Sequence, residues 1–316
     1  YSFSGIYFID VLVLFKFFII IFIIVVRTIY YFCHFKNLFM SLNLIEAVIL
    51  CPSCGGDLSV IEENIASSCC NKKFKVEDNQ IVIFNNTIFS NTEARSRDKQ
   101  AEGYLLHDKF PTQISILKRW ISKISHQLLD GSVLDIGCGP GPSTRMLLES
   151  GARDILSVDF SINSLRINKD ICKVYEHNPI YLLQDIRNLK LRRSSVSILL
   201  MADFLQHIIE KDARDNFLNE AMNSLIPGGY FFLSFFNINV KNYLSNDIFG
   251  SFSAGSIKYE RLDYNEVISS FPDNIIVESV TPMNIFNNAF FDRWICAFPF
   301  AKFFSRMIVV KGRKKF

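Results

Sequence analysis

Strong net charge and disulfide-type cysteine spacing are both missing from this sequence. The 34 Lys and Arg residues are nearly balanced by 31 Asp and Glu residues, which leaves a net charge of +3. So mild a balance does not by itself indicate a nucleic-acid partner. The eight cysteines lack the spacing of a short disulfide-rich secreted chain, and four of them fall between residues 51 and 70. This pattern favours a reducing compartment and a metal site over disulfides.

Residues 6–33 are mostly apolar, but no small-residue cleavage site follows them, so a signal peptide is disfavoured. A membrane-spanning helix needs about 20 mostly apolar residues, and this run reaches that length only by including Asp10 and Lys16. If it spans a membrane, the basic residues after it leave the bulk of the chain cytoplasmic and membrane-anchored. The sequence does not begin with Met, so residues 1–39 are alternatively translated upstream sequence, or they form an interfacial helix.

The 316 residues, 49% of them hydrophobic, are enough for one large domain and a smaller one. We expect a hydrophobic segment over residues 1–39 and a small cysteine-bearing β module over residues 40–86. A polar linker or lid is expected over residues 87–110, and a large α/β domain over residues 111–316.

A glycine-rich turn after a short apolar segment is the most informative motif. Residues 133–141 read Val-Leu-Asp-Ile-Gly-Cys-Gly-Pro-Gly, which predicts a buried parallel strand and a turn that a ligand can approach closely. A dinucleotide-binding loop would have a third glycine at the place of Pro142, so a dehydrogenase is disfavoured. The acid Asp135 at the head of the loop suits a ligand with a positive charge nearby rather than a pyrophosphate.

This motif resembles the first motif of the class I S-adenosylmethionine-dependent methyltransferases. Three later features agree with the resemblance: strand ends at Asp159 and Asp185, a loop ending in Leu-x-His at His207, and Leu-x-Pro-Gly-Gly before a strand at residues 225–229. The resemblance implies a Rossmann-like α/β fold with a seven-stranded sheet, helices on both faces and a final antiparallel strand. It also implies bound S-adenosylmethionine, held by Asp135, Gly137, Cys138, Gly139, Gly141, Asp159, Phe160, Asp185, Ile186 and Ala202.

Two acids have separate predicted roles in that site. Asp159 follows Gly139 by twenty residues, the offset at which an acid accepts hydrogen bonds from ribose hydroxyls. Its alternative role is that of a helix cap. The resemblance places Asp185 and the backbone of Ile186 beside the adenine, and the alternative for Asp185 is a plain turn residue.

His207 is the histidine placed nearest to the predicted site. It is a candidate general base for a hydroxyl acceptor, or else it orders its loop. No Asn-Pro-Pro-Tyr loop is present, which argues against the enzymes that methylate amino groups of adenine or glutamine.

The cysteine cluster begins with Cys51-Pro-Ser-Cys54, a spacing that can supply two corners of a zinc tetrahedron. Cys69 and Cys70 would complete the set, and zinc held by these four thiolates would be structural. The stretch resembles the zinc-ribbon module fused to the front of some methyltransferases, although Ser67 stands where that pattern has a cysteine. The alternative is a degenerate ribbon held by its own small core.

The predicted function is methyl transfer from S-adenosylmethionine to a small-molecule, sugar, quinone or lipid acceptor. The first alternative is an rRNA or tRNA base methyltransferase that uses the ribbon to bind RNA. The second is a non-catalytic module that binds a partner. We expect the loops after the strand at residues 230–234 to carry specificity. The aromatic stretch over residues 286–304 has three alternative roles: it lines an apolar substrate site, contacts a membrane or packs on the edge of the sheet.

Overall fold

We describe residues 21–25, 27, 42–61, 64–78, 80–84, 91–105, 111–124, 131–285 and 298–316 of a computed structural model. The chain divides into two units, Tyr1–Met40 and Ser41–Phe316, and the second carries the sheet and its helices. Most of the apolar run over residues 6–33 lies outside the described residues. Within the described ranges, no helix is long and apolar enough to cross a membrane.

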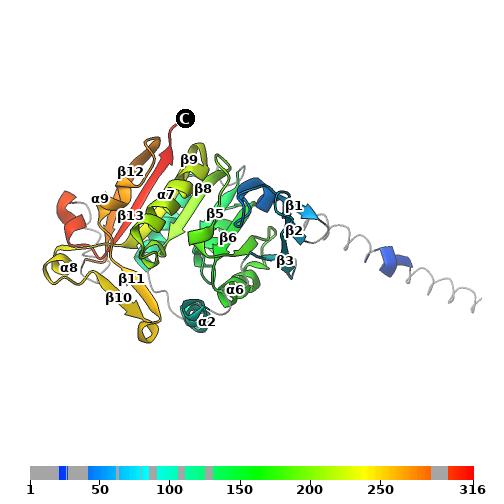
Figure 1. The fold of residues 1–316 in the computed structure, drawn as a ribbon, viewed down its shortest axis with the longest axis horizontal. Coiled ribbons are helices and arrows are strands. Elements are labelled where there is room, and N and C mark those ends of the chain that lie inside the picture. The colour runs from blue at the N-terminus through cyan, green and yellow to red at the C-terminus, as the bar shows by residue number, and fades with distance from the viewer. Residues whose placement is uncertain are drawn as a thin grey trace, which may run out of the picture. The chain divides into compact units, whose positions relative to one another are not determined.

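The second unit is a mixed sheet covered by helices, with its parallel core at the centre (Figure 1). The strands are β1 (Leu58–Ile61), β2 (Asn64–Ser67), β3 (Lys73–Glu77), β4 (Ile81–Ile83), β5 (Val133–Ile136), β6 (Ile155–Asp159), β7 (Ile180–Leu183), β8 (Val196–Ala202), β9 (Leu225–Phe236), β12 (Ile275–Met283) and β13 (Met307–Lys314). A separate hairpin pairs β10 (Phe249–Phe252) with β11 (Ile257–Glu260).

The helices are α2 (Thr92–Leu105), α3 (Pro111–Ile121), α5 (Pro142–Glu149), α6 (Ile162–Cys172), α7 (Lys211–Ser224), α8 (Val240–Leu244) and α9 (Tyr264–Ser269). Short 3-10 turns are η2 (Ile186–Asn188), η3 (Leu205–His207), η4 (Ser253–Gly255) and η5 (Pro299–Phe303). Residues 42–48 are also helical.

The strand order confirms the α/β methyltransferase-type sheet but corrects its size. Seven strands run in the order β7-β6-β5-β8-β9-β13-β12, with β13 antiparallel to both of its neighbours. The prediction of seven strands in all was wrong, because the sheet continues through β4, β3, β2 and β1 to eleven. The junction is a parallel pairing of β4 with β7. All three residues of β4 are buried, as expected for a strand inside a covered sheet.

The Pro-Gly-Gly turn predicted at residues 227–229 is instead part of strand β9. Val196 pairs with Leu225 and Ile198 pairs with Tyr230, so the glycines form a bulge between two paired segments. Gly228 has φ +77°, a conformation that favours glycine. The motif therefore interrupts pairing locally without ending the strand.

Apolar packing on both faces fixes the central strands. On one face, α3 and α5 contribute Leu117, Trp120, Met146 and Leu147 to a core with residues of β5, β8, β9 and β13. Near the β7 edge, Leu165 of α6 packs with Ile81 and Tyr181. Helix α2 lies beside α6 (Figure 1).

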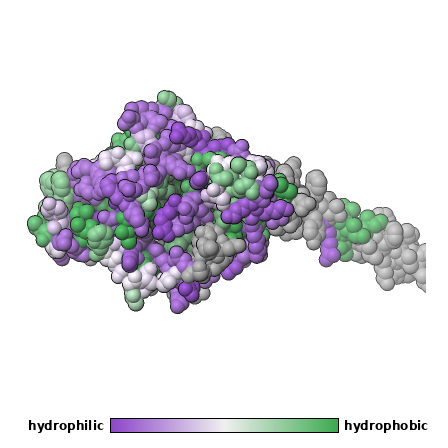
Figure 2. All heavy atoms as spheres, viewed as in Figure 1, coloured by the Kyte–Doolittle hydropathy of each residue, from purple (hydrophilic) through white to green (hydrophobic). Residues whose placement is uncertain are grey.

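Exposed apolar side chains gather around α8 and η5 (Figure 2). They include Tyr243, Leu244, Phe298, Phe300, Phe303 and Phe304. Residues 298–304 do not line the cavity described below. The rest of the predicted aromatic stretch, residues 286–297, lies outside the described residues.

Candidate cofactor and acceptor site

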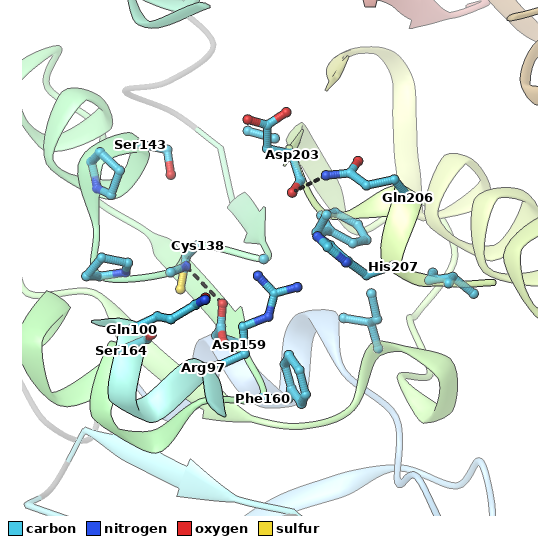
Figure 3. A pocket seen from close by; sticks show the side chains of 18 of the residues that line it. Arg97, Gln100, Cys138, Ser143, Asp159, Phe160, Ser164, Asp203, Gln206 and His207 are labelled. Carbon is cyan, nitrogen blue, oxygen red and sulfur yellow. Dashed lines mark hydrogen bonds between the residues drawn. The ribbon is translucent and has the colours of Figure 1, made fainter. Parts of the chain in front are cut away.

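A cavity of about 410 Å³ opens at the carboxyl ends of the parallel strands. Strands β5, β6, β7 and β8 all end at this edge of the sheet, which is where α/β sheets bind ligands. Nine of the predicted site residues line the cavity: Gly137, Cys138, Gly139, Asp159, Phe160, Asp185, Ile186, Ala202 and His207. Figure 3 shows several of these side chains around the opening.

The glycine loop bends as predicted and leaves room above itself. Gly137 and Gly139 have φ +70° and +53°. A Cβ atom at Gly137 would lie 2.7 Å from the Phe204 ring, so only glycine fits there. A Cβ at Gly139 would meet no atom within 4 Å, which leaves open space for a ligand. Pro142 is the first residue of α5, as the sequence predicts.

Asp159 faces this loop from the end of β6. One carboxylate oxygen accepts a hydrogen bond from the Gly139 N–H at 2.9 Å, and the other accepts from the Ser161 N–H at 2.9 Å. Burial raises the pKa of Asp159, and these backbone donors oppose the rise. Ser161, not Asp159, supplies the side-chain cap of α6, since its hydroxyl accepts from the Ser164 N–H. Each carboxylate oxygen therefore accepts one hydrogen bond from the backbone and keeps a lone pair for a ligand hydroxyl.

Asp135 lies beneath the loop and is not among the residues that line the cavity. One of its oxygens accepts hydrogen bonds from the Ser143 and Thr144 hydroxyls, both at 2.8 Å. The other oxygen is buried without a hydrogen-bond partner. Burial is the main cause that raises the Asp135 pKa to about 6. Gly141, the N-cap of α5, does not line the cavity either.

The turn after β7 carries Asp185, whose carboxylate is engaged by a neighbour. Arg187 donates to it from its backbone N–H at 3.0 Å and from its guanidinium at 2.6 Å. This ion pair raises the pKa of Arg187. Asp185 also caps η2, so both its predicted turn role and its place at the cavity are present in the structure.

His207 is held in one tautomer by a backbone carbonyl. Its Nδ1 lies 2.8 Å from the carbonyl oxygen of Lys258. A carbonyl only accepts, so Nδ1 carries the proton and Nε2 has a free lone pair. Burial lowers the His207 pKa to about 3, with a further contribution from the charge of Arg97. The ring is therefore neutral at physiological pH.

Helix α2 contributes cavity residues that the sequence did not reveal. Arg97 and Gln100 line the cavity, although the sequence predicts only a polar linker or lid over residues 87–110. The Arg97 Nε is buried without a hydrogen-bond partner, and the guanidinium lies between Asp159 and His207 (Figure 3). Asp98 fixes the helix by accepting hydrogen bonds from the Ser161 hydroxyl and the Asn163 N–H. No local signal marks Arg97, because its contacts are with residues distant in the sequence.

The far wall of the cavity is apolar and aromatic. Phe236 and Phe252 line it, and both rings pack against Tyr259. Phe252 belongs to the β10–β11 hairpin, and the neighbouring Ser253 hydroxyl accepts a hydrogen bond from Gln100. The hairpin and α2 thus meet over the cavity. The hairpin follows β9, where the sequence predicts specificity loops.

The cysteine cluster lies outside this cavity. The thiols of Cys51, Cys54 and Cys70 lie within 4.8 Å of one another, and the Cys51 and Cys70 sulfurs are 3.8 Å apart. Ser67 lies in the same cluster, with its hydroxyl 3.4 Å from the Cys54 sulfur. Cys69 is not part of the three-thiol group. Its thiol interacts with Cys54 instead, which raises the Cys69 pKa.

Comparison with known proteins agrees with this geometry. The family described as "Methyltransferase domain" matches residues 133–229, which hold the glycine loop, both strand-end acids and His207. The chain carries an S-adenosylmethionine-dependent methyltransferase domain. This confirms the enzyme class predicted from the glycine loop, and disfavours the alternative of a non-catalytic module.

The methyltransferase domain is similar to several named proteins. It is 29% identical over 184 residues to the ubiquinone biosynthesis O-methyltransferase of Paraburkholderia phymatum, an alignment covering 57% of this chain and 74% of that protein. It is 30% identical over 107 residues to the carboxy-S-adenosyl-L-methionine synthase of Shewanella halifaxensis, covering 32% of this chain and only 43% of that protein. A solved S-adenosylmethionine-dependent methyltransferase from Clostridium acetobutylicum has the same fold, with a TM-score of 0.51, 14% identity, and coverage of 69% of this chain and 99% of that one.

Proposed function

We propose that this chain transfers a methyl group from S-adenosylmethionine to a hydroxyl group of an apolar or aromatic small molecule, a class that includes quinols and lipids. The observation that carries the proposal is His207, a neutral imidazole with a free Nε2 lone pair in a cavity walled by Phe236 and Phe252. The similarity to proteins named ubiquinone biosynthesis O-methyltransferase supports the same acceptor class.

The glycine loop and the strand-end acids fit the cofactor. The open space over Gly139 accommodates its methionine part, and the carboxylate of Asp159 is free to accept from two ribose hydroxyls. We assign the adenine to the turn of Asp185 and Ile186, with Phe160, Cys138 and Ala202 as packing neighbours. Asp135 acts indirectly, by fixing Ser143 and Thr144 at the start of α5 beneath the loop.

In the reaction, bound S-adenosylmethionine supplies an electrophilic methyl group. The residues of the chain align the acceptor oxygen with it, and alignment is the main requirement of this chemistry. His207 accepts a hydrogen bond from the acceptor hydroxyl through Nε2 and so directs an oxygen lone pair at the methyl group. With a pKa of about 3, His207 is a poor final proton acceptor, because an efficient general base has a pKa near the working pH. The hydroxyl proton therefore passes on to solvent.

We also propose that the cysteine cluster holds structural zinc. Three thiols converge on one point, and hydrogen bonds from the Ser67 hydroxyl and the Gly56 backbone lower the pKa of Cys54 to about 6. A thiol that ionises this easily suits a metal, because the thiolate is the form that ligates. We place Cys69 as the fourth ligand, after a rotation of its side chain away from its present contact with Cys54.

A screen with labelled methyl donor tests the acceptor class. Purified chain is incubated with labelled S-adenosylmethionine and, in separate arms, hydroxylated aromatic small molecules, extracted lipids, sugars and ribosomal or transfer RNA. We expect label in hydroxylated apolar molecules, and His207→Asn to reduce that rate at least tenfold. Label in RNA alone would establish the RNA alternative instead. Calorimetry with S-adenosylhomocysteine checks cofactor binding independently of the acceptor.

A further inference from the structure

The cysteine cluster is attached to the turn that lines the cofactor cavity. The backbone N–H of Leu50 donates to the carbonyl of Lys190 at 2.9 Å, and the N–H of Arg192 donates to the carbonyl of Val48 at 2.8 Å. The Arg192 guanidinium also pairs with Asp57 at 2.8 Å. The loop that contains Cys51 and Cys54 is thus fastened to residues 190–192 from both sides.

Residues 190–192 lie directly after the cavity turn. Asp185 accepts from the Arg187 N–H and so caps η2, and the N–H of Leu189 donates to the carbonyl of Ile186 at 3.1 Å. Asp185, Ile186 and Arg187 all line the cavity. Only one short 3-10 turn therefore separates the cavity wall from the segment that the cysteine loop holds.

The sulfur positions fit a tetrahedral metal. Zinc–sulfur bonds are about 2.3 Å long, so two sulfurs on one tetrahedral zinc are about 3.8 Å apart. The Cys51 and Cys70 sulfurs are 3.8 Å apart, and the Cys54 sulfur lies within 4.8 Å of both. A cation at the centre of these three sulfurs would join Cys51 and Cys54 of one loop to Cys70 of another, and would so hold the loop of residues 51–54 in place.

We propose that zinc bound by Cys51, Cys54 and Cys70 positions the turn at Asp185, so that metal and cofactor bind with positive coupling. The identity of the cavity ligand rests on the proposed function, while the coupling rests on the contacts of residues 48–57 with residues 190–192. Coupling between two sites is reciprocal. S-adenosylhomocysteine must therefore raise the affinity of the chain for zinc by the same factor by which zinc raises its affinity for S-adenosylhomocysteine. We expect a factor of about fivefold or more, within the usual range for coupled sites.

A double-mutant cycle tests this coupling. The affinity of the full chain for S-adenosylhomocysteine is measured by calorimetry with zinc bound and after removal of zinc by a chelator. The same pair of measurements is made on Asp185→Ala and on Asp159→Ala. If zinc acts through the η2 turn, its removal weakens binding at least fivefold in the wild type and in Asp159→Ala, but by less than twofold in Asp185→Ala. Asp159 is the matched control, since it lies in the same cavity on β6.

Equal loss of affinity in both variants would overturn the proposal, because zinc would then act on the whole fold. Unchanged affinity in the wild type after zinc removal would overturn it too. Hydrogen exchange without any cofactor provides a second measurement: zinc should slow exchange of the amides at residues 186–192 and leave those at residues 159–161 unchanged. If S-adenosylhomocysteine does not bind at all, the proposed function fails, and the exchange experiment still decides on the coupling.

Cys69→Ser identifies the fourth ligand. If Cys69 completes the tetrahedron, this variant binds zinc at least tenfold more weakly, whereas Ser67→Ala binds it normally. The reverse result would assign the fourth position to the Ser67 hydroxyl, and neither result alters the role of the three thiols named above. Loss of zinc binding in Cys70→Ser is expected in either case, and retention of zinc there would contradict the site.

Discussion

Strands β5 and β6 are neighbours in the sheet, and each has an aspartate near its carboxyl end, but the two carboxylates meet different surroundings. Asp159 faces the cavity and accepts from backbone N–H groups of the glycine loop and of the next turn. Asp135 faces inward and holds two hydroxyls of α5. Similar motif positions therefore carry different tasks: one acid is placed to contact a ligand, and the other shapes the loop that does.

The largest expected effect separates these two tasks. Asp159→Ala should weaken S-adenosylhomocysteine binding by about 100-fold, or about 3 kcal/mol, because hydrogen bonds between ribose hydroxyls and a carboxylate are lost. Its unfolding free energy should change little. Asp135→Ala should instead lower the unfolding free energy by about 2 kcal/mol, since Ser143 and Thr144 lose their buried acceptor. Calorimetry and urea unfolding of both variants measure the two quantities. Equal losses of S-adenosylhomocysteine affinity in the two variants would contradict the assignment of ligand contact to Asp159 and of loop support to Asp135.

The acceptor side of the cavity offers a pH test of comparable size. His207 has a pKa of about 3 in the folded chain and about 6.5 when unfolded, so the unfolded chain binds more protons as the pH falls below 6.5. The contribution of His207 to the unfolding free energy is complete above pH 6.5 and is lost progressively as the pH falls to 3. Between pH 7 and pH 5, wild type should therefore lose about 2 kcal/mol more unfolding free energy than His207→Asn. Urea unfolding at both pH values gives the difference. Parallel behaviour of the two chains would mean that His207 is not buried as a neutral ring.

A smaller effect is expected for the helix that covers the cofactor side. Arg97→Gln should weaken S-adenosylhomocysteine binding about tenfold, or about 1.4 kcal/mol, since the partly buried guanidinium, which lies near Glu93, lines the cavity that we assign to a ligand with a carboxylate. Arg95→Gln is the matched control, because Arg95 is an exposed arginine on the same helix and does not line the cavity. Arg95→Gln should bind within twofold of wild type by calorimetry. Similar losses in the two variants would point to general electrostatics rather than to a specific contact.

The part of the site that lies at the strand ends could be predicted from local sequence. The glycine loop, Asp159 and the turn at Asp185 were predicted with their strands, because each depends on a short apolar run followed by a residue that the turn requires. The family resemblance also implied a final antiparallel strand, and the antiparallel pairing of β13 with β9 and with β12 confirms it.

Contacts between distant residues were not predictable in the same way. Arg97 enters the cavity because Asp98 of α2 accepts a hydrogen bond from Ser161, which is 63 residues away in the sequence. Helix α2 also lacks a strong apolar face, so its sequence does not predict where it packs. The pairing of β4 with β7 extends the sheet across about a hundred residues of sequence. Its only local sign is that Ile81, Val82 and Ile83 are all apolar, as in a strand covered on both faces.

The position of β13 has a consequence for how the molecule is made. This strand, residues 307–314, is inserted between β9 and β12, and among the described residues β12 pairs with no other strand of the sheet. During synthesis, β12 is therefore made before β13, the strand that joins it to the rest of the sheet. Until β13 is made, the edge of β9 has no partner strand on that side. We expect the sheet to remain incomplete until this strand has been synthesised and inserted, and the unpaired edges of β9 and β12 to be open to wrong pairing until then.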